Sequence, residues 1–269
     1  MKIALAQMAP RPGDLGQNIA AAAELVSEAA RAGADLVVFP ELALSGYLIR
    51  NRGQAALRAS DPRLTSLSVG STDVLMGFHE VNDEAWLNSA AYVSGGKLLN
   101  VHRKVFLPPG PEDEFSAGRY VRSFDSAHGR LATLICYDMW HLVSPWIAAQ
   151  DGAEVLLIPV NSVKDLGPAL SDVQGLWYDL ISLIARLHQC WVVFVNRVGS
   201  EEDHHFWGGS RVVDPEGNIV AQAAGSTPEL VIADIDVEYA RARRRELSLL
   251  TAANPSRIIG DLVRNERIR

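Results

Sequence analysis

The segment Leu134–Pro145, LICYDMWHLVSP, changes abruptly from apolar side chains to a group of polar and aromatic ones. The run RLATLIC that ends at Cys136 is typical of a buried strand. A free cysteine is most often a small packing residue, which is how we interpret the other cysteine, Cys190. A cysteine at the carboxyl end of a strand is different, because ligands bind at that edge of an open α/β sheet. The segment therefore indicates an α/β fold and makes Cys136 a candidate nucleophile.

Short, very apolar strands alternate with amphipathic helices along the rest of the chain, which favours sheets covered by helices. Strands are expected at residues 2–9, 35–41, 73–80, 85–94, 97–105, 130–136, 153–161 and 190–196, with a hairpin over 210–223. Helices are expected at residues 14–34, 140–151 and 171–188. Because no linker or internal repeat interrupts this pattern, residues 1–269 are predicted to form a single domain.

The composition is that of an ordinary globular protein, with 48% hydrophobic and 21% charged residues. A net charge of −7 argues against a nucleic-acid partner, which would require a basic surface. The apolar runs are too short to span a bilayer and the first residues do not resemble a signal peptide, so no membrane partner is expected. Two cysteines favour a reducing compartment over a disulfide framework. A cytoplasmic protein is therefore expected.

Three predicted strand ends each carry a reactive side chain: Glu41 after LVVFP, Lys104 after LNVHR, and Cys136 after LATLI. Each residue alone has an ordinary structural explanation, but together they supply the groups that acyl transfer requires. A thiol is nucleophilic only as a thiolate, so it needs a base or a nearby cation. A carboxylate can accept the thiol proton and later activate water, and an ammonium can stabilise the oxyanion of a tetrahedral intermediate.

These residues lie in three motifs, FPELALSGY, HRKVFLP and LICYDMW, that resemble those of the nitrilase superfamily of carbon–nitrogen hydrolases, in the same order. The resemblance covers nearly the whole chain, including GAEVLLIPVNS and FWGGSRVVDPEGNIV. It implies a four-layer αββα sandwich, with two β-sheets face to face and helices outside. It also implies a triad of Glu41 as general base, Lys104 as oxyanion stabiliser and Cys136 as nucleophile, with the backbone N–H of Tyr137 completing the oxyanion hole.

The resemblance implies further residues around this triad. A second glutamate orients the lysine in this family, and here Glu114 is the better match, with Glu112 as the alternative. Trp140, His141 and Asn161 are the candidate substrate-binding residues.

Trp140 stands where many amidases of this family have an arginine that contacts a substrate carboxylate. A carboxylate on the substrate would therefore need another partner, for which Arg197 and Arg211 are the candidates. No metal or organic cofactor is implied. His204 and His205 are adjacent without a spaced third ligand, which is typical of a solvated loop rather than a metal site.

The resemblance favours an amidase that cleaves a linear, non-peptide C–N bond of a small-molecule amide through a Cys136 thioester, releasing ammonia or an amine. Two other reactions stay open. A true nitrilase is one, although nitrilases place Trp-Glu after the cysteine where this chain has Tyr137-Asp138. A glutaminase that supplies ammonia to a separate partner is the other, since FPELALSGY and Trp140 resemble the glutaminase domain of NAD synthetase. An inactive interaction subunit is least favoured, because it would not need all three reactive side chains.

A homodimer or larger homo-oligomer is also expected. Family members often dimerise through the helix that follows the nucleophile, here predicted at residues 140–151. This segment has more apolar and aromatic side chains than one helix face would bury within a monomer, namely Trp140, Leu142, Val143, Trp146 and Ile147.

Overall fold

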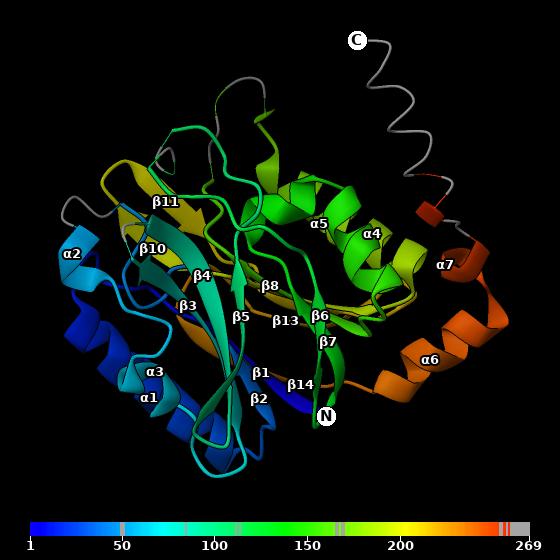
Figure 1. Cartoon of the computed structure of the whole chain (residues 1–269), viewed down its shortest axis with the longest axis horizontal. Coiled ribbons are helices and arrows are strands. Elements are labelled where there is room, and N and C mark those ends of the chain that lie inside the picture. Colours follow the sequence, from blue (N-terminus) through cyan, green and yellow to red (C-terminus); the bar gives the residue numbers. More distant parts are fainter. Residues whose placement is uncertain are drawn as a thin grey trace.

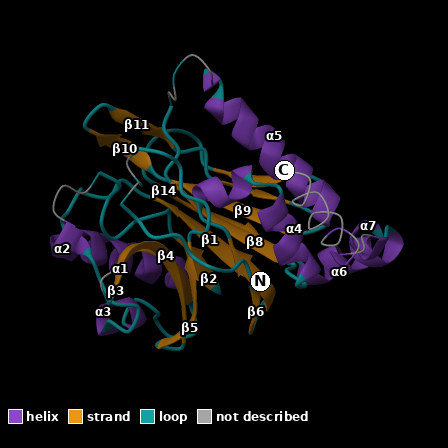
Figure 2. Cartoon of the chain, turned by 45° about the horizontal axis from the view of Figure 1, so that its top comes forward, coloured by secondary structure: helices purple, strands orange, loops and turns teal. Residues whose placement is uncertain are grey.

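The computed structural model describes residues 1–48, 52–83, 85–110, 112, 114–164, 167, 170–252, 255–256 and 258. Within these residues, two six-stranded mixed sheets lie face to face (Figures 1 and 2). The first sheet has the order β14 (Glu229–Asp234), β1 (Lys2–Gln7), β2 (Leu36–Val38), β3 (Asp73–Asn82), β4 (Ala85–Ser94) and β5 (Lys97–Arg103). The second has the order β13 (Ile219–Gln222), β12 (Arg211–Val213), β9 (Trp191–Asn196), β8 (Val155–Val160), β7 (Gly129–Thr133) and β6 (Ser123–Ser126).

Helices cover the two outer faces of this pair of sheets. Figures 1 and 2 show α1 (Leu15–Arg31) and α3 (Pro62–Thr65) on one side of the strands, and α4 (Val143–Gln150) and α5 (Val173–His188) on the other. This arrangement confirms the predicted αββα sandwich. The other described elements are α2 (Arg52–Ala55), a 3₁₀ turn at Cys136–Trp140, the hairpin β10 (Val198–Glu201) and β11 (His204–Trp207), α6 (Val237–Glu246) and α7 (Leu249–Ala252).

The core between the sheets is built from side chains of both. Leu36 and Leu75 of the first sheet belong to one buried cluster with Leu131 and Leu157 of the second, and all four are fully buried. Fully burying one such side chain contributes roughly 1.5–3 kcal/mol. The shared core therefore holds the two sheets, and the loops at their edges, in a fixed relation.

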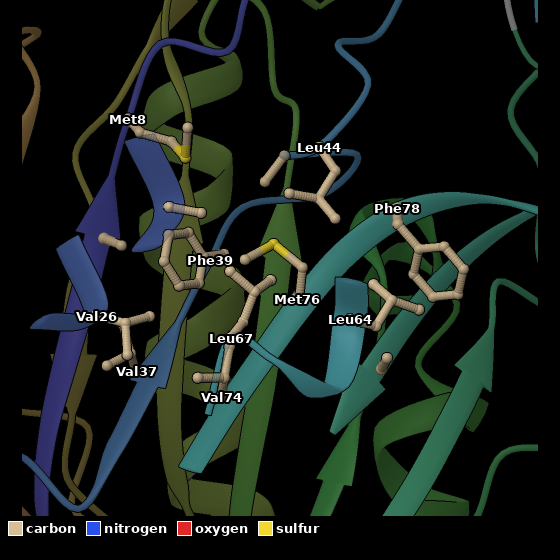
Figure 3. Close-up of a cluster of buried hydrophobic side chains, with 14 of the residues drawn as sticks. Met8, Val26, Val37, Phe39, Leu44, Leu64, Leu67, Val74, Met76 and Phe78 are labelled. Carbon is tan, nitrogen blue, oxygen red and sulfur yellow. The ribbon is translucent and has the colours of Figure 1, made fainter. Parts of the chain in front are cut away.

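The outer face of the first sheet is covered because α1 has the right sequence for a surface helix. Asp14 caps its N-terminus by accepting a hydrogen bond from the Gln17 backbone N–H, and Gly33 follows its end with φ of 76°. Its buried residues recur every three or four positions: Leu15, Asn18, Ala22, Val26 and Ala29. Figure 3 shows the cluster beneath α1 and α3, in which Val26 and Leu64 lie with Phe39 and Met76.

The strand directions bring two of the three motif residues to one edge of the first sheet. β2 and β3 are parallel, and β4 is antiparallel to both β3 and β5, so β5 runs in the same direction as β2. Glu41 lies three residues beyond β2 and Lys104 directly follows β5. Cys136 comes from the second sheet, three residues beyond β7. The site is therefore assembled across the two sheets.

The segment after Cys136 differs from the single helix that the sequence predicts over residues 140–151. A 3₁₀ turn covers Cys136–Trp140, His141 is extended, and α4 begins only at Val143. The later start has a physical reason, because Pro145 lacks an N–H and fits only the first turn of a helix.

The single domain predicted over residues 1–269 includes residues outside the described ranges and stays a prediction. No helix among the described residues is long and apolar enough to cross a membrane.

Gly77 of β3 allows the loop that carries Glu41 to lie directly against the sheet. A Cβ at this position would lie 2.2 Å from the Pro40 carbonyl oxygen and 2.9 Å from the Glu41 Cα. We expect Gly77→Ala to lower the free energy of unfolding by about 1–3 kcal/mol, because the backbone at Glu41 must move. Urea unfolding measures this change. Gly16→Ala in α1, whose added Cβ meets nothing closer than 3.9 Å, is the control. Equal stabilities for the two variants would contradict the close approach.

Candidate active site

A buried ammonium between two carboxylates is the centre of the site. Lys104 Nζ lies 2.7 Å from Glu41 Oε1 and 2.6 Å from Glu112 Oε1. The side chains of all three residues are at most 1% exposed. Asn88 Nδ2 donates to Glu41 Oε1 at 2.7 Å and to Glu112 Oε2 at 3.3 Å, and the Tyr47 hydroxyl donates to Glu112 Oε1. Each carboxylate is therefore fixed by a second donor besides the lysine.

The glutamate beside the lysine is Glu112, which was expected only as the alternative to Glu114. Glu114 is exposed to solvent, whereas Glu112 is buried with the Lys104 ammonium. The two lie two residues apart in an irregular loop, where no helical or strand period indicates which side chain points inward. The burial of Glu112 therefore corrects the expected position.

The charges in this cluster shift one another's protonation. Burial alone would lower the pKa of Lys104, but Glu41 and Glu112 hold it well above its ordinary value. Burial raises the pKa of Glu112, Lys104 lowers it and Glu41 raises it, with a raised pKa as the net result. One cation and two carboxyl groups give a net charge of −1 when both carboxyls are ionised, so the cluster disfavours a further negative charge.

Cys136 occupies a strained position beside this cluster. Its φ of 43° lies in the left-handed region, which costs a residue with a side chain about 1–2 kcal/mol. Burial raises the pKa of the thiol well above its ordinary value, Glu41 raises it further and Lys104 lowers it. A hydrogen bond from the Asn161 backbone also lowers this pKa. The resting cysteine is therefore a thiol, next to a carboxylate that can accept its proton.

Asp138 joins the loop of the lysine to the loop of the cysteine. Its Oδ1 accepts hydrogen bonds at 2.9 Å from the backbone N–H groups of Val105 and Phe106, directly after Lys104. Its Oδ2 accepts one at 3.0 Å from Ile135 and lies 2.8 Å from His102 Nε2. The hydrogen bond from His102 holds the pKa of this carboxyl below its ordinary value despite the opposing effect of burial. The sequence reasoning missed this role, although Asp138 follows the cysteine by only two residues.

Two of the three predicted substrate-binding residues, Trp140 and His141, lie on the 3₁₀ turn and next to it. The Tyr137 ring makes an edge contact with His141 and a tilted contact with Trp140, with centroids 5.1 and 6.0 Å apart. Trp140 packs edge-on against Trp177 of α5, and His141 stacks on Phe106 at 3.9 Å. These rings form an aromatic wall beside Cys136.

Asn161 directly follows β8, and it brings unpaired polar atoms to the site. It is 5% exposed, and its side-chain Oδ1 and Nδ2 have no hydrogen-bond partner among the described residues. Its backbone hydrogen-bonds to Cys136. A buried amide without a partner carries a desolvation cost that a polar ligand would relieve.

The two arginines that the sequence offered for a substrate carboxylate lie in different environments. Arg197 is paired with Glu201 and stacks over Phe206, so its charge is already compensated. The Arg211 guanidinium lies over the Tyr178 ring and faces a surface cleft, and the described residues that line this cleft do not include Cys136. Among the described residues, no group of three or more His, Cys, Asp and Glu side chains is arranged to hold a metal ion.

The chain matches one protein-family model over most of its length. The model for carbon–nitrogen hydrolases covers residues 2–245. An (R)-stereoselective amidase of Pseudomonas sp is 30% identical over 259 residues, which are 93% of this chain and 90% of the amidase. A glutamine-dependent NAD⁺ synthetase of Thermotoga maritima is 32% identical over 88% of this chain, but the match covers only 42% of the synthetase.

The fold is shared with a solved amidase of the same superfamily. An amidase variant from Nesterenkonia sp. AN1, whose active-site cysteine has undergone Michael addition of acrylamide, superimposes with a TM-score of 0.78 and 26% identity. The match covers 92% of this chain and 98% of that one.

The pKa of the Cys136 thiol gives a direct test of the charge arrangement. We expect Glu41→Gln to lower this pKa, because the substitution removes a negative charge that raises it. The thiolate fraction would then appear at lower pH, as measured by thiolate absorbance in a pH titration. Burial raises the pKa of Cys190 to about 12, and the titration is run in a Cys190→Ala background to remove its signal. An unchanged or higher thiol pKa in the Glu41 variant would contradict the arrangement.

Proposed function

Because the chain belongs to the carbon–nitrogen hydrolase family, we propose that it is an amidase that hydrolyses a linear, non-peptide C–N bond of a small-molecule amide. One observation carries the proposal: the fully buried Lys104 ammonium is held between the carboxyl groups of Glu41 and Glu112, and Glu41 is close enough to Cys136 to raise the pKa of its thiol. This arrangement supplies a nucleophile, a base and an oxyanion stabiliser in one place. The match to the Pseudomonas amidase over 90% of that enzyme supports it.

The proposed reaction begins when Cys136 attacks the amide carbonyl carbon and its thiol proton passes to Glu41. Lys104 and the Tyr137 backbone N–H stabilise the oxyanion. Glu41 then gives the proton to the leaving nitrogen, so ammonia or an amine departs and a thioester remains. Water, deprotonated by Glu41, attacks the thioester and releases the carboxylic acid with the regenerated thiol. Glu112 acts as a positioning residue by holding Lys104.

Exchanging each proposed catalytic residue tests this mechanism. We expect Cys136→Ala, Lys104→Ala and Glu41→Gln each to lower kcat by at least about a thousandfold, because the remaining groups give only residual catalysis. Cys190→Ala should keep full activity. Ammonia release measures turnover, and circular dichroism shows whether each variant is folded. Normal turnover by Cys136→Ala would make the assignment wrong.

The two candidate glutamates form a matched pair for the positioning role. Glu112→Gln should lower kcat about a hundredfold with a smaller effect on KM, because a displaced ammonium stabilises the oxyanion poorly. Glu114→Gln should leave kcat unchanged, since its side chain is exposed. The pH dependence of kcat should also shift in the Glu112 variant alone. Equal effects of the two substitutions would contradict the assignment to Glu112.

The site also favours a class of substrate. We expect primary or simple amides to be hydrolysed in preference to nitriles, and neutral or aromatic acyl groups in preference to acidic ones. Trp140 offers a flat apolar surface, and a carboxylate buried there without a cation would cost several kcal/mol. Acidic substrates should therefore have kcat/KM values at least about tenfold lower. A panel of amides, nitriles and glutamine tests this, and glutamine as the best substrate would favour the glutaminase instead, in line with the similarity to NAD synthetase.

We further propose a homodimer or larger assembly formed through α4 and the adjoining α5. Leu142, Val143 and Ile147 at α4 are 57%, 47% and 37% exposed, and Leu183 and Leu187 of α5 are each almost half exposed. Exposed apolar groups of this kind mark interfaces. Light scattering should give at least a dimer, and Leu183→Glu should shift it toward monomer. A wild-type monomer at micromolar concentration would contradict the proposal.

A further inference from the structure

Arg211 is a buried cation that the proposed reaction does not use. Arg211 is the first residue of β12, and only 6% of its surface is exposed. Its Nε donates to the Gly209 carbonyl oxygen at 3.2 Å, and its guanidinium lies over the Tyr178 ring, 3.2 Å from the centroid. No carboxylate among the described residues forms an ion pair with it. A buried charge of this kind is costly unless something compensates it.

The contrast with a paired arginine shows how unusual this environment is. Hydrogen bonds to Glu80 raise the pKa of Arg103 above its ordinary value. Burial instead lowers the pKa of Arg211, and Tyr178 opposes this effect only in part. Within the described part of the chain, Arg211 donates a hydrogen bond through Nε alone, so its Nη groups are available to an acceptor.

Arg211 lines a cleft of about 670 Å³ that lies between α5, the β10–β11 hairpin and the segment after β13. The polar side chains in its described lining include Lys164, Gln174, Ser200, His205 and Gln222. None of the described lining residues is acidic, in a chain whose net charge is −7. The cleft therefore combines the buried charge of Arg211 with the exposed Lys164 and with neutral hydrogen-bonding groups.

We propose that this cleft, the Arg211 cleft, binds a small organic carboxylate at a site separate from Cys136. Tyr178 covers one face of the guanidinium, so an anion approaches in its plane, where the free Nη groups match the two oxygens of a carboxylate. One buried positive charge balances a monoanion. Phe206 and Trp207 supply apolar surface for the body of the ligand.

The separation from the catalytic groups follows from the packing. A row of rings runs from Trp140 through Trp177 and Phe194 to Trp207, with successive centroids 5.7, 5.2 and 5.7 Å apart. Tyr178 then packs on Trp207 at 5.6 Å. Neither Glu41, Lys104 nor Cys136 lines the Arg211 cleft. The inference therefore does not depend on the proposed amidase activity.

Calorimetry on the purified chain with benzoate as probe tests the proposal. We expect saturable binding of one benzoate per chain, retained after iodoacetamide has alkylated Cys136. Arg211→Met should weaken binding about 30-fold or more, because the charge pair is lost. Lys97→Met, at an exposed position on the β4–β5 hairpin, is the control and should bind as the wild type does. Methyl benzoate, which lacks the charge, should not compete.

Each alternative result decides against the inference. Equal affinity in folded Arg211→Met, competition by methyl benzoate, or loss of binding on alkylation of Cys136 would each overturn it. Tighter binding of inorganic phosphate would overturn the carboxylate assignment. If Arg211→Met does not fold, the affinity of Lys164→Met for benzoate is the test instead. Because Lys164 is an exposed residue of the cleft lining, its replacement should weaken benzoate binding a few-fold at low salt and not at high salt. An unchanged affinity at low salt would then contradict the proposal.

Discussion

The buried ammonium of Lys104 constrains the rest of the site. A lysine without exposed surface would normally lose its proton, because burial disfavours the charged form. It stays protonated here because Glu41 and Glu112 contact it from two directions, at 2.7 and 2.6 Å. Two carboxylates around one cation leave a local excess of negative charge. Burial raises the pKa of the neighbouring Cys136 thiol, and Glu41 raises it further, because a thiolate would add another negative charge to a buried cluster.

Such a cluster forms only if the two sheets keep a fixed position relative to each other. The lysine and Glu41 extend from the first sheet and the cysteine from the second, so any sliding of one sheet on the other would separate them. The shared core opposes large movements. Asp138 holds the lysine loop and the cysteine loop together by accepting hydrogen bonds from backbone groups on both. The same carboxylate, by binding the Ile135 N–H, stabilises the turn in which Cys136 has its left-handed conformation. Strain at a reactive residue persists only where the surroundings fix it in this way.

Much of this could be predicted from the sequence, because strand ends and apolar runs are local signals. Sheets covered by helices, and reactive side chains at the strand ends near Glu41, Lys104 and Cys136, follow from them, whereas the αββα order of the layers was implied by the resemblance of the three motifs to a known family. The choice between Glu112 and Glu114 could not be predicted, since an irregular loop has no period that defines an inward side. The late start of α4 depends on Pro145 and an extended His141, which a helical pattern of apolar residues conceals. That no carboxylate in the described ranges pairs with Arg211 is a tertiary property with no sequence signal.

The distribution of buried cations bears on which anions the molecule can accept, and where. Of the lysines and arginines buried in the described part of the chain, Lys104 and Arg197 have carboxylate partners and Arg211 has none. A carboxylated ligand near Cys136 would meet the excess negative charge of the Glu41 and Glu112 pair and an aromatic wall without a free cation. Across the row of rings, the same ligand would meet a single unpaired guanidinium. Electrostatics therefore favours a neutral ligand near Cys136 and an organic anion on the Arg211 side of that row.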